Sequence, residues 1–178
     1  MRWYLLKTWP GKEEQLIEKI QRTVSPDLYG ECFVISQQRI WRKQQKNVVH
    51  VEKLFPGCVF FTCKNTDYVF ERLKSAPSIA GMIMCGELAI LPMRKADADF
   101  LLRISGEDHM VKLSSVRKGE NGQLCEISGP LKVCSGQIER YQLKKRYAVI
   151  RHNLWGENLG IVMGIALKED MDLRSYFE

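Results

Sequence analysis

Hydrophobic residues in the first hundred positions recur with two different spacings, which predicts both strands and helices. Short aliphatic and aromatic runs bounded by turn residues are typical of strands, and the first such run ends at a Trp-Pro-Gly turn. Apolar positions three and four residues apart are typical of helices. The expected order, β-α-β-β-α-β-α, predicts an α+β domain with helices packed on an antiparallel or mixed sheet. The predicted strands are 2–8, 31–36, 59–63 and 82–85.

Three helices are predicted, two between these strands and one after the last of them. The first, 12–24, begins with two glutamates, whose negative charge favours a helix N-terminus, and a Ser-Pro pair ends it. Asp67 is the expected cap of the second helix, 68–75. The third helix, 94–104, is expected to turn three apolar residues inward: Ala98, Leu101 and Leu102.

Residues 37–53 interrupt this pattern because they are polar and basic around a single tryptophan, Trp41. We expect an exposed hairpin or loop there. Its cations are Arg39, Arg42, Lys43, Lys46 and Lys53.

The second half of the chain is organised differently. A stretch rich in glycine, serine and charge, 106–121, predicts a linker between an N-terminal domain, 1–105, and a C-terminal domain, 122–178. Beyond the linker, short β-like segments separated by glycine-containing turns predict a small β-barrel. These segments lie near 124–127, 137–141, 147–152 and 160–165.

Composition narrows the class of protein. The chain has no apolar run of about 18 residues, and its apolar N-terminal patch is too short for a signal peptide. We therefore expect a cytoplasmic protein with no membrane partner. The six cysteines form no CxxC pair, which favours reduced thiols. The formal net charge of +6 favours an anionic partner without naming one.

The chain lacks the motifs of common enzyme sites. It contains no P-loop, GxGxxG or HExxH motif, and its three histidines have no sequence neighbours that indicate a catalytic triad. Cys58 and Cys63 lack a second pair of ligands that would complete a tetrahedral zinc site. We therefore expect no enzymatic activity, no metal and no cofactor.

Residues 140–155 carry the densest chemical signal, a basic and aromatic run without acidic residues. Cations neutralise phosphates and aromatic rings stack on bases, so the run predicts a nucleic-acid surface. The alternative is a polar turn that only faces solvent. If Tyr147 and Val149 face the barrel core, only part of the run can touch a nucleic acid. The cations are Arg140, Lys144, Lys145, Arg146 and Arg151, joined by His152, and the other aromatic residues are Tyr141 and Trp155.

Motifs in both halves resemble the NusG family of bacterial transcription elongation factors. In the first half these are RWYLL (2–6), GKEE (11–14) and LFPGCVFF (54–61), the last similar to the family's FPGYVFV-type motif. In the second half GPL (129–131), GQI (136–138) and LWG (154–156) resemble the family's KOW barrel, an SH3-like fold. The order and spacing of these motifs extend the resemblance over nearly the whole chain.

The resemblance implies a monomeric factor whose N-terminal domain binds the clamp helices of RNA polymerase in an apolar pocket. By motif match the pocket residues are Trp3, Phe55, Pro56 and Cys58, although Trp3 could equally be a core residue. Cys58 stands where the family usually has an aromatic residue, which implies a different fit. The resemblance also implies that Arg39, Arg42 and Lys43 could approach exposed non-template DNA; a solvated hairpin tip is the alternative.

The basic segment 136–149 is most similar to specialised paralogs of the family, in particular LoaP. This similarity implies operon-selective elongation or antitermination, with the barrel binding an RNA hairpin in the nascent transcript. One further cation, Lys132, is expected in the loop after the Gly-Pro pair. The residues predicted to bind RNA are Lys132, Arg140, Lys144, Lys145, Arg146, Arg151, His152 and Trp155.

Two other interpretations stay open at this point. In general NusG proteins the barrel binds a ribosomal protein or the termination factor Rho, and Trp155, where the family usually has Phe, is compatible with such an adaptor. A barrel that switches to helices, as in RfaH, is disfavoured by the β-branched residues and glycines of 149–162.

Overall fold

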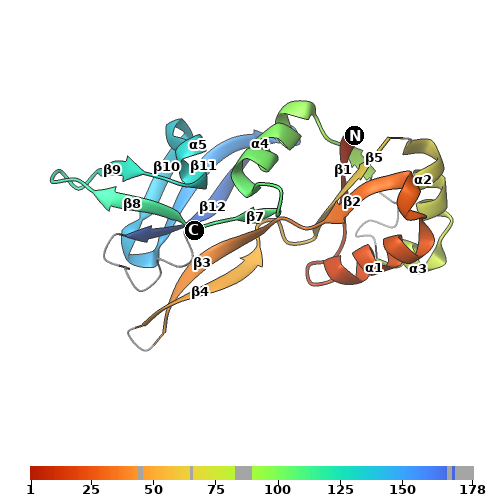
Figure 1. Ribbon diagram of the computed structural model, residues 1–178, viewed down its shortest axis with the longest axis horizontal. Coiled ribbons are helices and arrows are strands. Elements are labelled where there is room, and N and C mark those ends of the chain that lie inside the picture. The colour runs from red at the N-terminus through yellow and green to blue at the C-terminus, as the bar shows by residue number, and fades with distance from the viewer. Residues whose placement is uncertain (44–45, 65, 83–89, 168–169, 171–178) are drawn as a thin grey trace. The chain divides into compact units, whose positions relative to one another are not determined.

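A computed structural model describes residues 1–178 apart from 44–45, 65, 83–89, 168–169 and 171–178 (Figure 1). The chain divides into two units that are each discontinuous in sequence. The first unit holds residues 1–35 and 55–99, and the second holds 36–54 and 100–178. Of the predicted strand 82–85, only Met82 is among the described residues, where it lies in a turn.

The first unit is an antiparallel sheet with helices, as the sequence pattern predicts. Its strand order is β2-β5-β1-β6, and each neighbouring pair is antiparallel. Among the described residues, no helix is both long and apolar enough to cross a membrane. The elements are β1 (Arg2–Lys7), α1 (Glu13–Thr23), η1 (Pro26–Leu28), β2 (Tyr29–Phe33), β5 (Cys58–Cys63), α2 (Thr66–Lys74), α3 (Pro77–Ala80), β6 (Ile90–Pro92) and the start of α4 (Lys95–Ser105).

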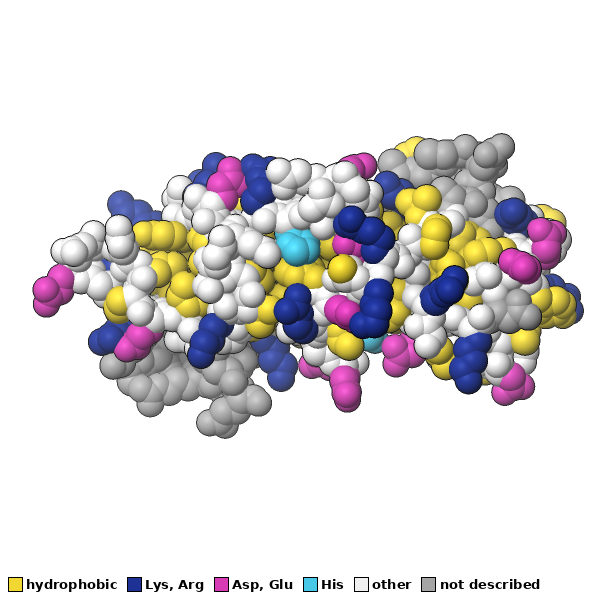
Figure 2. Space-filling view, turned by 90° about the horizontal axis from the view of Figure 1, so that it is seen from above, with side chains coloured by type: hydrophobic (Ala, Val, Ile, Leu, Met, Phe, Trp, Pro, Cys, Tyr) yellow, Lys and Arg dark blue, Asp and Glu magenta, His cyan; other side chains and the backbone are white. Residues whose placement is uncertain are grey.

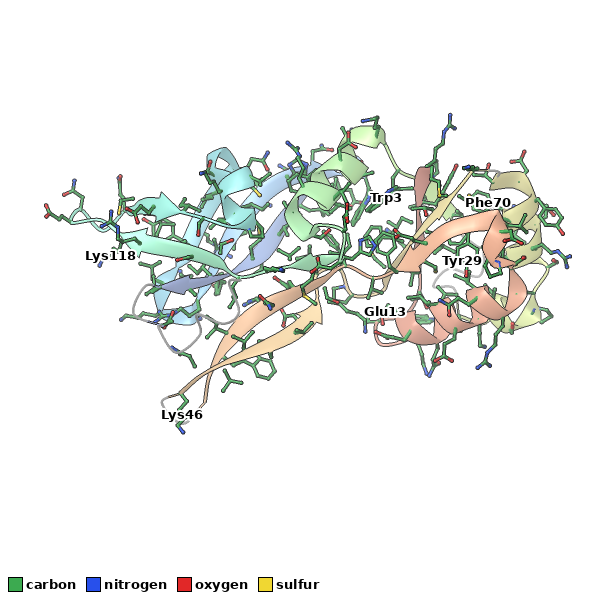
Figure 3. The ribbon with its side chains drawn as sticks, in the orientation of Figure 1. Trp3, Glu13, Tyr29, Lys46, Phe70 and Lys118 are labelled. Atoms are coloured by element: carbon green, nitrogen blue, oxygen red, sulfur yellow. The ribbon has the colours of Figure 1, made fainter. Side chains whose placement is uncertain are left out.

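One face of this sheet carries the hydrophobic core of the unit. Tyr4 of β1 and Phe61 of β5 belong to a buried cluster that includes side chains from α1, α2 and α3. Tyr29 and Phe70 pack against the same cluster (Figure 3). Because successive strand residues point to opposite faces, Trp3 lies on the other face of the sheet.

The second unit contains two sheets, of five and three strands. The five-stranded sheet is curled, has the order β10-β11-β12-β8-β9 and contains one parallel pair, β12 with β8 (Figure 1). The smaller sheet has the order β4-β3-β7. The elements are β3 (Ser36–Lys43), β4 (Lys46–Lys53), β7 (Met110–Val111), β8 (Ser114–Lys118), β9 (Leu124–Ile127), α5 (Pro130–Val133), η2 (Ser135–Gln137), β10 (Ile138–Gln142), η3 (Leu143–Lys145), β11 (Tyr147–Leu154) and β12 (Glu157–Leu167).

The hairpin of β3 and β4 packs on the larger sheet of the same unit. Ile40 of the hairpin forms a buried cluster with Leu113 and with Ala166 of β12. At Gly164 of β12, a Cβ atom would lie 2.2 Å from the carbonyl oxygen of Gln38, so only glycine fits this approach. The predicted hairpin is therefore confirmed, and its packing places it in the second unit.

Three local expectations were wrong: the bounds of one strand, the cap of one helix and the inward direction of one leucine. The predicted strand 31–36 spans a break, because β2 ends at Phe33 and β3 begins at Ser36. Asp67 lies inside α2, which begins one residue earlier. On α4, Ala98 and Leu101 are buried but Leu102 is 42% exposed. Leu102 lies outside the arc of the helix that holds the buried residues Ala98, Phe100, Leu101 and Ile104.

The predicted linker, 106–121, contains strands β7 and β8. Ser114 and Ser115 of β8 pair in parallel with residues of β12. Ser114 is fully buried, and its hydroxyl accepts a hydrogen bond from the backbone N–H of Leu131 at 2.8 Å. A serine thus fills a core position because its hydroxyl has an internal partner, which composition could not indicate.

Candidate functional site

The basic tripeptide Lys144-Lys145-Arg146 forms the turn between β10 and β11, which correspond to the predicted segments near 137–141 and 147–152. The last antiparallel pair before the turn is Gln142 with Tyr147. Lys144 and Lys145 lie in the short helix η3 and are exposed. Arg146 ends the turn in a left-handed conformation with φ of 55°. The turn therefore presents two lysines to solvent and turns the chain at the arginine.

Arg146 binds inside the second unit. Its Nε donates to Oδ2 of Asp170 at 2.7 Å, and its Nη2 donates to Oδ1 at 2.8 Å. Nη1 donates to the carbonyl oxygen of Leu143 within the turn. The Arg146 side chain is only 18% exposed and that of Asp170 only 2%. This predicted RNA residue therefore fixes the turn that carries the lysines.

Two predicted residues of β11 also have internal partners. The guanidinium of Arg151 donates to the Glu139 carboxylate at 2.8 Å, and this hydrogen bond lowers the pKa of Glu139. The ring of His152 stacks on Phe100, with centroids 3.7 Å apart and planes 12° apart. Both contacts leave these side chains less available to a ligand than the lysines of the turn. Val149 is buried, and Tyr147 is half-buried.

Trp155 occupies a strained turn at the other end of β11. Leu154 pairs with Glu157, so Trp155 and Gly156 form a two-residue loop between β11 and β12. Their φ angles are 58° and 82°, and such a loop favours Asn, Asp or Gly at its first position. The half-buried tryptophan is therefore held in an uncommon conformation by its surroundings.

The remaining predicted RNA residues are exposed. Arg140 lies on β10, next to the turn. Lys132 lies on the short helix α5, whereas the sequence indicated a loop there. Figure 2 shows one face of the molecule, on which the described Lys and Arg side chains stand apart among acidic and hydrophobic ones. On that face they form no continuous basic ridge.

An aromatic cluster lies on the sheet face opposite the core of the first unit. Trp3 meets Phe33 edge-on, with centroids 5.1 Å apart, and meets Phe60 at 6.1 Å (Figure 3). Phe55 meets Phe60 at 6.3 Å. Two predicted pocket residues, Trp3 and Phe55, thus contact one central ring. Cys58 is partly buried on β5, and burial raises its pKa to about 11, while Pro56 is exposed.

The turn of the FPG motif is joined to the first helix. The carboxylate of Glu13, at the start of α1, accepts a hydrogen bond from the backbone N–H of Gly57 at 2.6 Å. The backbone N–H of Thr8 donates to the Gly57 carbonyl at 2.8 Å. Gly57 has a φ of 78°, so a side chain there would be strained. These contacts position Phe55 and Cys58 on either side of the turn.

On the hairpin, Arg39 donates to Glu52 at 3.0 Å and lies over the Tyr147 ring, 5.6 Å from its centroid. The side chains of Arg42 and Lys43 lie outside the described residues. Trp41 and Val48 are directly opposed across the hairpin and are 61% and 47% exposed. The sequence singled out the cations here, and the structure adds this exposed apolar pair.

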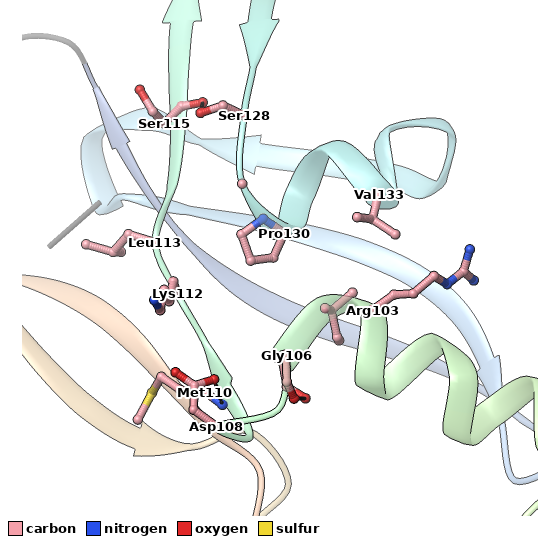
Figure 4. A pocket seen from close by; sticks show the side chains of 13 residues that line it. Arg103, Gly106, Asp108, Met110, Lys112, Leu113, Ser115, Ser128, Pro130 and Val133 are labelled. Atoms are coloured by element: carbon pink, nitrogen blue, oxygen red, sulfur yellow. Dashed lines mark hydrogen bonds between the residues drawn. The ribbon is translucent and has the colours of Figure 1, made fainter. Parts of the chain in front are cut away.

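A cleft of about 720 Å³ lies in the second unit between the end of α4, β8 and the start of α5 (Figure 4). Arg103 and Lys112 approach it from opposite sides (Figure 4). None of the predicted site residues is among the described residues that line it.

Sequence reasoning missed the partners of the predicted cations. Glu139 directly precedes Arg140 on β10. The pairing of this strand with β11 could have indicated that Glu139 contacts Arg151. Asp170 is 24 residues from Arg146, and no local pattern marks it. Phe100 comes from α4, far from His152 in sequence, and was equally hidden.

Comparisons with known proteins agree with the resemblance. A family model described as "Transcription termination factor nusG" matches residues 1–102. The transcription termination/antitermination protein NusG of Buchnera aphidicola is 30% identical over 165 residues, or 88% of this chain and 89% of the relative. The Haemophilus influenzae protein of the same name is 25% identical, over 87% of this chain and 86% of the relative.

A solved structure of Thermotoga maritima NusG matches the fold with a TM-score of 0.54 and 24% identity. The match covers 92% of this chain and 93% of that chain. The α+β first half and the curled, KOW-like sheet of the second half are therefore confirmed. The matched segments include the FPG turn and the aromatic cluster around Phe60. The chain belongs to the NusG family of transcription termination/antitermination proteins.

Proposed function

We propose that the protein is an operon-selective elongation and antitermination factor, a specialised NusG paralog of the LoaP type. Its first unit binds RNA polymerase, and its second unit binds an RNA hairpin in the nascent leader. The observation that carries the RNA assignment is a pair of exposed lysines, Lys144 and Lys145, on a turn whose end is fixed by a buried ion pair.

The turn suits a folded RNA because its charge is available and its backbone is constrained. Of the ion pairs among the described residues, none involves Lys144 or Lys145. Arg140 is exposed on the adjoining strand. Folded RNA is recognised largely through its shape and phosphates, which such point charges can bind. Arg146 acts indirectly here, by positioning the two lysines.

The polymerase assignment rests on the aromatic cluster and on family membership. Trp3, Phe55 and Phe60 form a connected apolar group on the sheet face opposite the helices. Phe60 is fully buried, whereas Trp3 and Phe55 are partly exposed, and a helix tip of a large partner can bind these two rings through apolar contact. Cys58, beside this group, supplies less contact area than an aromatic residue would.

Co-purification with RNA polymerase, followed by sequencing of the bound transcripts, tests the whole proposal. Enrichment of a few leader RNAs is expected, whereas uniform recovery of all transcripts would contradict operon selectivity. Recovery of a ribosomal protein or a termination factor on the second unit, without RNA, would favour the adaptor function instead.

The lysines are tested with an RNA hairpin recovered in that experiment. The double variant Lys144→Ala/Lys145→Ala should bind it more weakly, and the salt dependence should shrink by about one unit per lost phosphate contact. Lys118→Ala removes an exposed lysine of β8 and serves as the matched control. Equal behaviour of the double variant and the control would refute the assignment.

A further inference from the structure

The hairpin of β3 and β4 has two chemically different faces. Ile40 belongs to the buried cluster of the second unit, and its cross-strand partner Val49 is partly buried and packs against that cluster. Because strand residues alternate, Trp41, Val48 and His50 lie on the opposite face, which we call the outer face of the hairpin. On the outer face Arg39 packs on Tyr147, whereas Trp41 and Val48 remain exposed and no packing within the described part of the unit explains them.

The outer face presents an aromatic ring that is both exposed and held in place. Trp41 is 61% exposed, the most exposed of the large aromatic side chains in the described residues. The His50 ring packs against it, with centroids 3.7 Å apart and planes at 35°. His50 Nε2 lies 3.3 Å from a carboxylate oxygen of Glu52, which fixes the imidazole in turn. The indole is thus supported from one side and open to solvent.

Charge around this ring favours a polyanion. Residues 36–53 contain five cations and one acid, which gives a net charge of +4 within a chain of +6. Glu52, the one acid, is bound to Arg39. Lys46, at the start of β4, is exposed. Single-stranded nucleic acids are bound by an exposed aromatic ring flanked by positive charge, because the ring stacks on a base and the cations attract its phosphates.

The hairpin is tied directly to the turn that carries the lysines. Asn47 Nδ2 donates to Oδ1 of Asp170 at 2.7 Å, and Arg146 Nη2 donates to the same oxygen at 2.8 Å. Lys46 precedes Asn47, and Lys144 and Lys145 precede Arg146. The shared carboxylate therefore brings two basic segments, separated by about a hundred residues in the chain, to one place.

We propose that the outer face of the hairpin extends the RNA-binding surface and stacks Trp41 on an unpaired base next to the RNA stem. This inference rests on the proposed RNA binding by the second unit. In this arrangement the hairpin binds the single-stranded flank of the RNA, and Lys144 and Lys145 bind the paired stem.

The test uses the full-length chain and two labelled stem-loop RNAs, one blunt and one with a short unpaired uridine tail. Trp41→Ala should weaken binding of the tailed RNA roughly 5- to 150-fold, the loss expected for one stacked base, and leave the blunt RNA unchanged. Trp41→Phe should retain most of the affinity for the tail. Val51→Ala is the matched control, because it removes another apolar side chain of the hairpin that is 57% exposed.

The outcomes separate the two proposals. If Trp41→Ala binds each RNA as tightly as the wild-type chain does, the role of the hairpin is overturned and the proposed function still stands. A wild-type chain that binds neither RNA would overturn both. Tighter binding of the same stem-loop with a deoxythymidine tail would assign the hairpin to DNA and refute the RNA inference. Circular dichroism of each variant should match the wild type, since the altered side chains are exposed.

Discussion

The Asp170 carboxylate holds the Arg146 guanidinium with two hydrogen bonds, of 2.7 and 2.8 Å. The same carboxylate accepts from the backbone N–H of Leu167 at 2.7 Å and from Asn47. One buried side chain thus joins the end of β12, the hairpin and the basic turn. Arg146, in the middle of a basic run, therefore has a structural partner in Asp170, and Lys144 and Lys145 before it are exposed.

Removal of this carboxylate should destabilise the second unit. Asp170→Asn leaves the largely buried Arg146 without its counter-charge, which should lower the free energy of unfolding by about 3 kcal/mol. Urea denaturation measures this change. Glu139→Gln is the control: it breaks the pair with Arg151, whose side chain is 46% exposed, and should change stability little. Equal losses in the two variants would contradict the role given to Asp170.

The close approach of the hairpin to β12 predicts different effects at two glycines of one strand. In Gly164→Ala, the added methyl group would lie 2.2 Å from the Gln38 carbonyl oxygen, which is backbone and cannot move aside cheaply. We expect a loss of about 1–3 kcal/mol in the free energy of unfolding. Gly160→Ala is the matched control, because its nearest neighbours lie at 3.6 Å. Thermal denaturation of both variants checks this, and a stable Gly164→Ala would disprove the tight contact.

The hydrogen bond between Glu13 and Gly57 predicts that the helix entry stabilises the FPG turn. Glu13→Ala leaves the buried Gly57 N–H without this acceptor and should cost about 2 kcal/mol, as for other bonds to charged groups. The neighbouring Glu14 is exposed, so Glu14→Ala should cost much less. Urea denaturation gives the stability, and binding to RNA polymerase should weaken in Glu13→Ala only. A polymerase affinity that Glu13→Ala leaves unchanged would separate the turn from the binding pocket.

Two partly buried thiols predict that stability falls at high pH. Burial raises the pKa of Cys58 from 9.0 to about 11 and that of Cys32 to about 12. The unfolded chain releases these protons at lower pH than the folded chain, so their contribution is complete below pH 9. It is lost as the pH rises towards 11. Unfolding in urea across this range should show a smaller decline for Cys58→Ala than for the wild type. Parallel declines would show that Cys58 does not contribute.

Much of the fold could be predicted because it follows from local patterns. The spacing of apolar residues, two apart in strands and three or four apart in helices, located most of these elements within a few residues. Examples are the buried strand β5 and the amphipathic helix α1. A turn carrying Lys144, Lys145 and Arg146 was expected between the β-like segments near 137–141 and 147–152, and the structure has it. The break between β2 and β3 and the strands inside 106–121 were missed. The parallel partners of these strands, β7 for β3 and β12 for β8, lie far away in sequence.

The sequence by itself determined the family, the α+β and KOW-like halves, and the concentration of positive charge at 37–53 and 140–151. These properties depend on residue type and on neighbours a few positions away. Only the tertiary structure decided that Arg146 turns inward to Asp170, that Ser114 is buried, and that the hairpin with Trp41 packs beside the basic turn. Each of these depends on partners distant in the chain, because hydrogen bonds and close packing form between residues that folding brings together, whatever their separation in sequence.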